Sequence, residues 1–244
     1  MTPHASSHFE SLAGQTALVT GGSRGIGLAI ARRLVRQNAR VAICGRDAAA
    51  LKAAVAALSH EGAEVLPFRV DLMCPGDIPR LAESVNKSLG PISILINNAG
   101  VGIFGPATEL TEAHWDTVLD TNLKAVFLLC RAVAPQMIRR KAGHIINISS
   151  LAGKNAFPGG AVYCASKWGL QGFTYCLAEE LRAHNIRVSV ICPGTVATEF
   201  SPHAGKDASK MLQPDDVAHA VEMLLAQAPQ SFISEVLLRP AQKP

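Results

Sequence analysis

One stretch near the start of the chain decides the fold: Thr20-Gly21-Gly22-Ser23-Arg24-Gly25-Ile26-Gly27. It follows the apolar run 16–20 directly and leads into a helical pattern at 26–37. Glycines let the backbone turn sharply and approach a pyrophosphate closely, and the start of a helix offers free N–H groups and a positive dipole end. Strand-to-helix turns need glycine in any case. The position of this loop at the first strand–helix junction is what predicts a nucleotide site.

The rest of the chain alternates short apolar runs with longer helical patterns. Strands are predicted at 16–20, 40–44, 64–69, 93–97, 143–149, 187–192 and 235–238, and helices at 26–37, 48–60, 75–89, 112–140, 161–184 and 214–226. Continuous apolar strands fit a sheet covered on both faces, and strand–helix alternation implies parallel pairing through right-handed crossovers. We therefore predict a doubly wound, Rossmann-type α/β fold of about seven parallel strands with helices on both faces. Its ligand should lie at the carboxyl ends of the strands, where the strand order reverses.

No repeat or low-complexity linker divides the chain, so we expect a single domain over residues 1–244, with 1–13 as a flexible N-terminus. Hydrophobic residues make up 48% of the chain and charged residues 17%, a balance that fits a sizeable core and excludes disorder. The formal charge of +4 is spread too thinly for a nucleic-acid surface.

Cysteine and histidine spacing excludes further classes of protein. The six cysteines show neither C-x-x-C nor zinc spacing, and the eight histidines form no pair with metal-ligand spacing. The N-terminus lacks the apolar core of a signal peptide, and no apolar run is long enough to span a bilayer. We expect a cytoplasmic protein with reduced thiols, no metal, and neither a membrane nor a nucleic-acid partner.

The end of the second predicted strand indicates which dinucleotide binds. NAD-binding sheets usually place an acidic residue there, which accepts hydrogen bonds from the ribose 2′-hydroxyl. Here Gly45 and Arg46 occupy this position, and Arg24 lies in the glycine loop. Either arginine alone could be a solvated surface residue. Two guanidiniums, with no carboxylate to oppose them, predict the 2′-phosphate of NADP(H).

A candidate catalytic group follows the fifth predicted strand. That strand ends in Ser149-Ser150, and Tyr163 and Lys167 lie four residues apart on the next helix. Residues at this spacing share a helix face, so an ammonium there should lower the tyrosine pKa from its ordinary value of about 10 and suit it to proton transfer. The Ser150 hydroxyl could bind the charge that develops on a carbonyl oxygen. A lone Tyr-x-x-x-Lys pair is usually an accident of a helix surface, but the serine and the nucleotide loop make chance a poor explanation.

Taken in order, these motifs resemble the short-chain dehydrogenase/reductase family from Gly14 to the C-terminus. They are Thr-Gly-x-x-x-Gly-x-Gly, Asn97-Asn98-Ala99-Gly100, Ser150 with Tyr163-x-x-x-Lys167, and Pro193-Gly194. The resemblance implies that Tyr163 is the general acid/base and that Ser150 orients the carbonyl. It also implies that Lys167 activates the tyrosine and binds the nicotinamide ribose, and that Asn122 holds a water that feeds Lys167.

The same resemblance implies the cofactor contacts. Asp71 would contact adenine, Asn97 would lie on the adenosine side, and Val196 and Thr198 would hold the nicotinamide carboxamide. The full set of expected cofactor contacts is Gly21, Ser23, Arg24, Gly25, Ile26, Gly27, Arg46, Asp71, Leu72, Asn98, Ala99, Gly100, Tyr163, Lys167, Pro193, Gly194, Val196 and Thr198.

Three functions fit this pattern. The apolar loop residues Ile103, Phe104, Phe157 and Phe200 are candidates to line the site, which favours the reduction of a small apolar or aromatic ketone or aldehyde. The second function is a 3-oxoacyl-(acyl-carrier-protein) reductase, although the chain after the last strand lacks the glycine-rich tail that is common in the family. The third is a protein that senses NADP(H) without turnover, and the set Asn122, Ser150, Tyr163 and Lys167 argues against it, because a sensor needs no proton relay. The stretch 199–213, where the family often has a lid, is short and predicts an open site.

The chain also carries signs of self-association. The helices predicted at 112–140 and 161–184 have apolar residues on more than one face: Val126, Phe127, Leu129, Trp168, Leu170, Phe173 and Leu177. One domain cannot easily bury them all, so we expect a homodimer or homotetramer built on these helices across a two-fold axis.

Overall fold

A computed structural model describes residues 11–200 and 207–244, so most of the N-terminus expected to be flexible lies outside the described residues. The described chain is built on one parallel sheet of seven strands in the order β3-β2-β1-β4-β5-β6-β7. The strands are β1 (Thr16–Thr20), β2 (Arg40–Gly45), β3 (Val65–Arg69), β4 (Ile92–Asn97), β5 (Gly143–Ile148), β6 (Ile186–Pro193) and β7 (Glu235–Leu238). The α-helices are α1 (Gly25–Arg36), α2 (Ala48–Ser59), α3 (Asp77–Leu89), α4 (Glu112–Leu119), α5 (Ala125–Arg140), α6 (Ala161–Arg182) and α7 (Pro214–Leu225).

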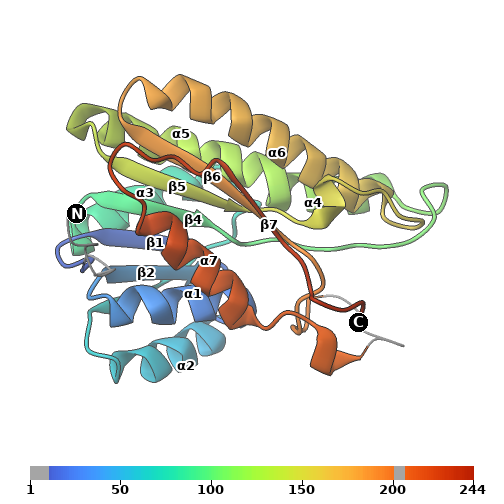
Figure 1. Cartoon of the computed structure of the whole chain (residues 1–244), viewed down its shortest axis with the longest axis horizontal. Coiled ribbons are helices and arrows are strands. Elements are labelled where there is room, and N and C mark those ends of the chain that lie inside the picture. Colours follow the sequence, from blue (N-terminus) through green and yellow to red (C-terminus); the bar gives the residue numbers. More distant parts are fainter. Residues whose placement is uncertain (1–10, 201–206) are drawn as a thin grey trace, which may run out of the picture.

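Helices cover both faces of the sheet, as predicted (Figure 1). α1, α2 and α7 pack on one face around a core that includes Ile30, Leu34 and Val217, and α3, α5 and α6 pack on the other. All five residues of β1 are buried, because each side of this central strand faces a layer of helices. The doubly wound α/β fold is therefore confirmed. In the part of the chain that the structure describes, no helix has the length and apolar character needed to cross a membrane.

The helix predicted at 112–140 is helical throughout, but it is not α-helical throughout. It consists of α4 and α5, which are joined by one turn of π-helix, η1 (Asp120–Lys124). A π-turn adds one residue to the helix, a change too local for the hydrophobic pattern of the sequence to show. Such turns occur frequently at functional sites, and this one contains Asn122.

The strand order reverses between β1 and β4. β1 pairs with β2 on one side and with β4 on the other, so the chain winds outward from this point in both directions. Helices from the two faces leave a crevice where the order reverses. The carboxyl ends of β1, β4, β5 and β6 therefore bring the glycine loop, Asn98, Ser150 and Pro193 to one edge of the sheet.

Candidate active site

A cavity of about 1310 Å³ opens at this edge of the sheet. Of the predicted site residues, those that line it are Gly21, Ser23, Arg24, Gly25, Ile26, Arg46, Asp71, Leu72, Asn98, Ala99, Gly100, Ser150, Tyr163, Lys167, Pro193, Gly194, Val196 and Thr198. Gly27 and Asn122 lie behind this lining, where they contact residues of the site. The cavity thus brings together residues spread from position 21 to position 198.

The glycine loop is shaped for close contact with a phosphate. Gly21 and Gly25 have positive φ angles of 63° and 53°, which favour glycine. A Cβ on Gly27 would lie 2.2 Å from the Gly21 carbonyl oxygen and 2.5 Å from the side-chain nitrogen of Asn98, so only glycine allows α1 to start this close to the loop. Among the described residues, no side chain caps the first turn of α1 and no acidic residue lies in it. Its N–H groups and positive dipole end therefore fit a pyrophosphate.

The surroundings of the expected 2′-phosphate site contain acidic residues as well as the two predicted arginines. Arg46 is exposed at the end of β2 and lines the cavity, but Arg24 is paired with Glu199, with 3.0 Å between Nη1 and Oε2. Asp47 also lines the cavity, which corrects the expectation that no carboxylate lies here. Its Oδ1 accepts hydrogen bonds from the N–H groups of Ala49 and Ala50 and so caps α2. Arg46 is therefore the arginine here that most directly suits a phosphate.

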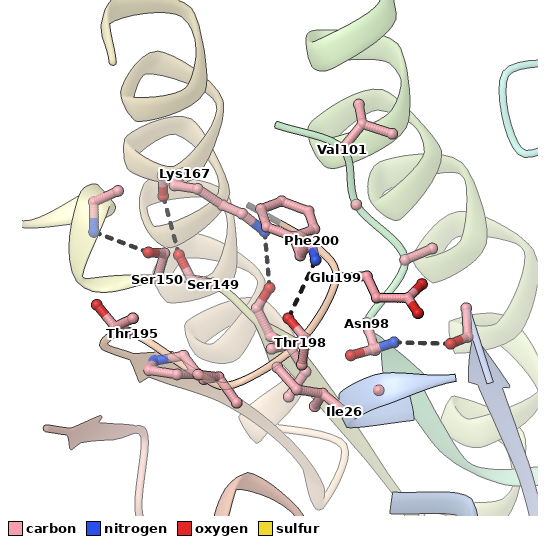
Figure 2. Close-up of a pocket in the computed structure, with 18 of the residues that line it drawn as sticks. Ile26, Asn98, Val101, Ser149, Ser150, Lys167, Thr195, Thr198, Glu199 and Phe200 are labelled. Carbon is pink, nitrogen blue, oxygen red and sulfur yellow. Dashed lines mark hydrogen bonds between the residues drawn. The ribbon is translucent and has the colours of Figure 1, made fainter. Parts of the chain in front are cut away.

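Ser150, Tyr163 and Lys167 meet at the end of β5. Tyr163 is 8% exposed and Lys167 is 4% exposed. The Lys167 ammonium donates to the carbonyl of Ile148 at 3.0 Å and lies 5.8 Å from the centre of the Tyr163 ring. The Ser150 hydroxyl accepts the N–H of Ala152 at 3.0 Å. Figure 2 shows Ser149, Ser150 and Lys167 toward one side of the pocket, and Ile26 and Asn98 toward the other.

Burial controls the protonation of this group. It raises the pKa of Tyr163 to about 12, although a hydrogen bond from Ser150 acts in the opposite direction. Burial also lowers the pKa of Lys167 from 10.5 to about 8, against a smaller raising effect of Cys192. The expectation of a lowered tyrosine pKa is therefore corrected, because loss of solvent is the largest effect on the phenol and the opposing effect of Ser150 is smaller. At pH 7 the phenol keeps its proton and the ammonium its charge.

Asn122 is 1% exposed and joins the loop after β4 to α6. Its amide accepts the Val101 N–H at 2.8 Å and donates to the Val101 carbonyl at 2.9 Å and to the Ser166 hydroxyl at 3.0 Å. A Cβ on Gly100 would lie 3.2 Å from the Asn122 oxygen and 3.8 Å from the Lys167 nitrogen. These contacts place Asn122 beside Lys167 and hold the wall of the cavity there.

The structure corrects two other expectations. Asn97 is 2% exposed and donates to the side-chain oxygen of Asn147 at 2.8 Å, away from the adenosine side. Its neighbour Asn98 lines the cavity and donates to the Thr20 carbonyl at 2.9 Å. Ile103 is not among the described residues that line the cavity.

Two of the predicted apolar residues pack against the tyrosine, and a third packs on one of these two. The rings of Phe104 and Phe200 lie 5.4 and 5.8 Å from the ring of Tyr163, centre to centre, and Phe157 lies 6.1 Å from Phe104. The side of the cavity next to the phenol is therefore aromatic. The stretch 199–213, predicted to be short and to leave the site open, includes residues 201–206, which lie outside the described residues.

Some lining residues have no counterpart among the predictions. Glu199 reaches Arg24, and the chain after β7, residues 239–244, runs back along the cavity. The second feature follows from topology, because β7 is parallel to β6 and must end at the same edge of the sheet. Among the described residues, no three His, Cys, Asp or Glu side chains gather as metal ligands would.

Comparison with known proteins identifies the family. A family model described as short chain dehydrogenase matches residues 15–209. Dehydrogenase/reductase SDR family member 4 from Oryctolagus cuniculus is 41% identical over 81% of this chain and 76% of the relative. A 3-oxoacyl-(acyl-carrier-protein) reductase from Chlamydia trachomatis is 33% identical over 93% of this chain and 96% of the relative. A metagenomic short-chain oxidoreductase solved in complex with NADP superposes with a TM-score of 0.85 at 47% identity, covering 96% of this chain and all of the other. The chain belongs to the short-chain dehydrogenase/reductase family.

Proposed function

We propose that this chain uses NADPH to reduce a small apolar or aromatic ketone or aldehyde. The observation that carries the proposal is the environment of Tyr163. Its phenol is protonated at neutral pH with Ser150 close to it, the rings of Phe104 and Phe200 pack against its own, and Phe157 packs on Phe104. A carbonyl oxygen placed at this hydroxyl would have its apolar substituents against the aromatic wall.

The cofactor half of the proposal rests on the glycine loop and Arg46. The uncapped start of α1 would hold the pyrophosphate, and Arg46 would hold the 2′-phosphate. Asp71 and Leu72 would bound the adenine, and Val196 and Thr198 the nicotinamide. NADPH supplies the hydride when bound. Solved relatives of similar fold in complex with NADP and with NADPH support this choice.

The residues of the chain supply the binding and the proton. The Ser150 hydroxyl donates a hydrogen bond to the carbonyl oxygen and stabilises the negative charge that develops there. The Tyr163 hydroxyl gives its proton to the same oxygen, which becomes the alcohol hydroxyl. The nearby Lys167 ammonium favours the phenolate that remains. A tyrosine pKa of about 12 keeps the proton donor protonated at neutral pH, as carbonyl reduction requires.

A panel of carbonyl compounds, followed by the loss of NADPH absorbance, tests this proposal. We expect small aryl and alkyl ketones or aldehydes to be reduced faster than sugars or charged oxo acids. Preference for a 3-oxoacyl thioester would instead favour the acyl-carrier-protein reductase. Tight NADPH binding without turnover of any compound in the panel would favour a protein that senses NADP(H).

The assembly and the location are also proposals. We propose a homodimer or homotetramer formed through α5 and α6, on the exposure of the aromatic residues Phe127 and Trp168. The single-domain organisation and the cytoplasmic location stay predictions from the sequence.

A further inference from the structure

The segment after β5 carries two parts of the proposed site. It begins with Ser150, continues through the short helix η2 (Leu151–Gly153) and reaches the aromatic wall at Phe157. A catalytic hydroxyl is effective only at a defined position, and a misplacement of about 1 Å can cost about 10²-fold in rate. Whatever holds this segment therefore affects the chemistry without touching the substrate.

The first contact that holds the segment comes from Gln171, one helical turn after Lys167 on α6. Gln171 is 3% exposed, and its amide nitrogen donates to the Ser149 hydroxyl and to the Ser150 carbonyl, both at 3.2 Å. The Ser149 hydroxyl in turn donates to the Lys167 carbonyl at 3.4 Å. One buried amide thus bonds to both serines at the end of β5.

Gly153 shows how closely η2 lies against this amide. A Cβ at this position would be 2.0 Å from the Gln171 side-chain nitrogen and 2.8 Å from the Lys167 carbonyl oxygen. The turn that follows Ser150 therefore packs directly on α6 at Gln171, and the space that a larger residue would need is filled by the amide.

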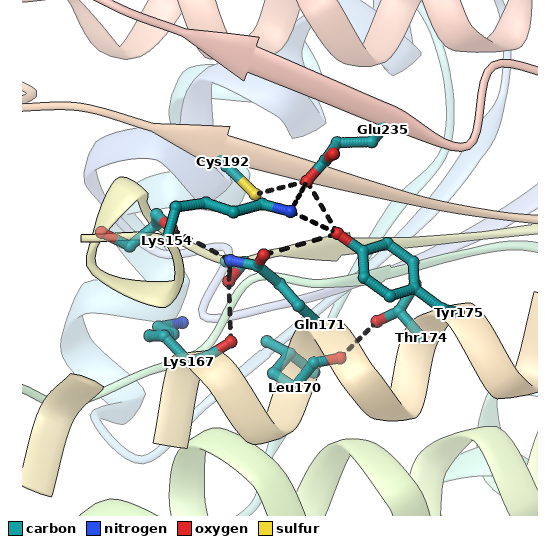
Figure 3. Close-up of polar contacts among 10 residues, drawn as sticks. Lys154, Lys167, Leu170, Gln171, Thr174, Tyr175, Cys192 and Glu235 are labelled. Carbon is teal, nitrogen blue, oxygen red and sulfur yellow. Dashed lines mark hydrogen bonds and ion pairs between the residues drawn. The ribbon is translucent and has the colours of Figure 1, made fainter. Parts of the chain in front are cut away.

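A second set of contacts holds the far end of η2 (Figure 3). The Lys154 ammonium lies 2.7 Å from Glu235 Oε1 on β7 and donates to the Tyr175 hydroxyl at 2.7 Å. The Tyr175 hydroxyl is also 2.8 Å from Glu235 Oε1 and 3.5 Å from Gln171 Oε1. We call Lys154, Tyr175 and Glu235 the β7 cluster. The Tyr175 hydroxyl has one proton, which can go to Glu235 or to the Gln171 oxygen, so the β7 cluster reaches Gln171 through the longer of two alternative hydrogen bonds.

We propose that Gln171, braced by the β7 cluster, is a positioning residue for Ser150. Its amide holds the Ser149 hydroxyl and the Ser150 carbonyl, and the β7 cluster holds the end of η2 and contacts the amide oxygen. The inference rests on the proposed role of Ser150 at the carbonyl oxygen. A glutamine that served only stability would change folding and leave the rate intact, so the experiment measures the two separately.

The experiment is a double-mutant cycle between Gln171 and Ser150. Gln171→Met keeps the length of the side chain and removes both donors. We expect kcat for ketone reduction to fall about 10- to 100-fold, with the NADPH dissociation constant changed less than about two-fold, because Gln171 acts on the catalytic hydroxyl. In a Ser150→Ala background the same substitution should lower kcat less than about three-fold, because the effects of substituting two residues that act through one another do not add. The matched control is Gln136→Met, which should leave kcat unchanged. Gln136 lies on α5, and its half-buried amide donates a hydrogen bond to Asn86.

The outcomes separate the inference from the proposed function. If Ser150→Ala is as active as the wild type, the role of Ser150 fails and the inference falls with it. If Ser150→Ala is slow but Gln171→Met is not, or if the two losses multiply, Gln171 is merely structural and only the inference is overturned. Should Gln171→Met not fold, Tyr175→Phe at the helix surface makes the same test. It should lower kcat by about two- to five-fold in the wild type and have no effect on Ser150→Ala.

Discussion

Tyr163 and Lys167 lie one helical turn apart, and burial acts on their protons in opposite directions. It holds the phenol protonated and brings the ammonium, with a pKa of about 8, close to losing its charge. The four-residue spacing was enough to predict that the two side chains share a face. It could not predict the direction of the tyrosine shift, because desolvation depends on what other segments place around the phenol. Phe104 and Phe200, distant in sequence, provide much of that cover.

The protonated phenol leads to a test at Tyr163. Tyr163→Phe keeps the ring and its packing against Phe104 but removes the proton donor at the carbonyl oxygen. Turnover should fall by roughly 10²- to 10⁴-fold, as for the loss of a positioned general acid, while NADPH affinity stays the same. Lys167→Ala, measured alongside, should weaken both, because the ammonium is assigned to the ribose and to the tyrosine. Equal ketone reduction by wild type and Tyr163→Phe would contradict the mechanism.

Cofactor choice is a second question at the scale of one residue. Arg46→Asp replaces a guanidinium that would bond the 2′-phosphate with a carboxylate that would repel it. The ratio of NADPH to NADH affinity, measured by titration of each cofactor, should fall toward or below one. Arg24→Ala should have a smaller effect, because this arginine is already paired with Glu199. An unmodified protein that prefers NADH would show the assignment to be wrong.

Secondary structure was predictable at the scale of the element wherever hydrophobic pattern and glycine positions decide it. All seven strands lie where the apolar runs placed them, with ends shifted by one residue at most. The π-turn at Asn122 could not be predicted, since its extra residue is accommodated by contacts with Val101 and Ser166 that only the folded chain provides.

β5 carries a buried histidine that should make stability depend on pH. His144 lies beside the Ser189 hydroxyl of β6, 2.9 Å away, and burial lowers its pKa from 6.5 to about 3. Between these values the unfolded chain binds a proton that the folded chain does not, so the free energy of unfolding decreases as the pH falls below 6.5. One such group lowers the free energy of unfolding by up to about 1.4 kcal/mol for each pH unit, which amounts to about 2–3 kcal/mol by about pH 4.5.

Denaturant unfolding at a series of pH values measures this loss. His144→Val removes the titrating group and should flatten the dependence of the free energy of unfolding between pH 6.5 and about 4.5, whatever its effect at neutral pH. His184→Asn, at an exposed position, is the control and should leave the slope unchanged. An identical slope in wild type and His144→Val would assign the acid sensitivity to other groups.

At the scale of the whole molecule, topology accounts for features that local pattern could not provide. Residues 239–244 line the cavity because β7 runs parallel to β6 and ends at the same edge. Glu199 reaches Arg24 because the chain after β6 meets the glycine loop, where Thr198 lies within 4 Å of a Cβ built on Gly25. Both features bring together segments that are more than 100 residues apart in the sequence. Local sequence motifs therefore do not predict them.

Packing of the whole molecule determines which apolar residues stay exposed and could form an interface. Val126, Leu129 and Leu170, which the sequence offers as interface residues, belong to the core and are at most 3% exposed. Phe127 and Trp168 are 44% and 54% exposed, and the ring of Phe173 packs edge-on against Phe127 at 6.2 Å. α5 and α6 lie on the same side of the sheet (Figure 1), so this aromatic surface is available to a second copy.

Trp168→Glu tests whether that surface joins copies of the chain. In a two-fold interface each copy contributes the same patch, so the substitution buries two unpaired carboxylates at once, and leaving such charges buried is strongly destabilising. Light scattering at micromolar concentration should give two or four times 25.7 kDa for the wild type and a lower mass for the variant. Ala53→Glu puts the same charge on the exposed surface of α2, on the other side of the sheet, and should leave the mass unchanged. A wild type that is monomeric would rule out the proposed assembly, and a Trp168→Glu variant with unchanged mass would move the interface away from α6.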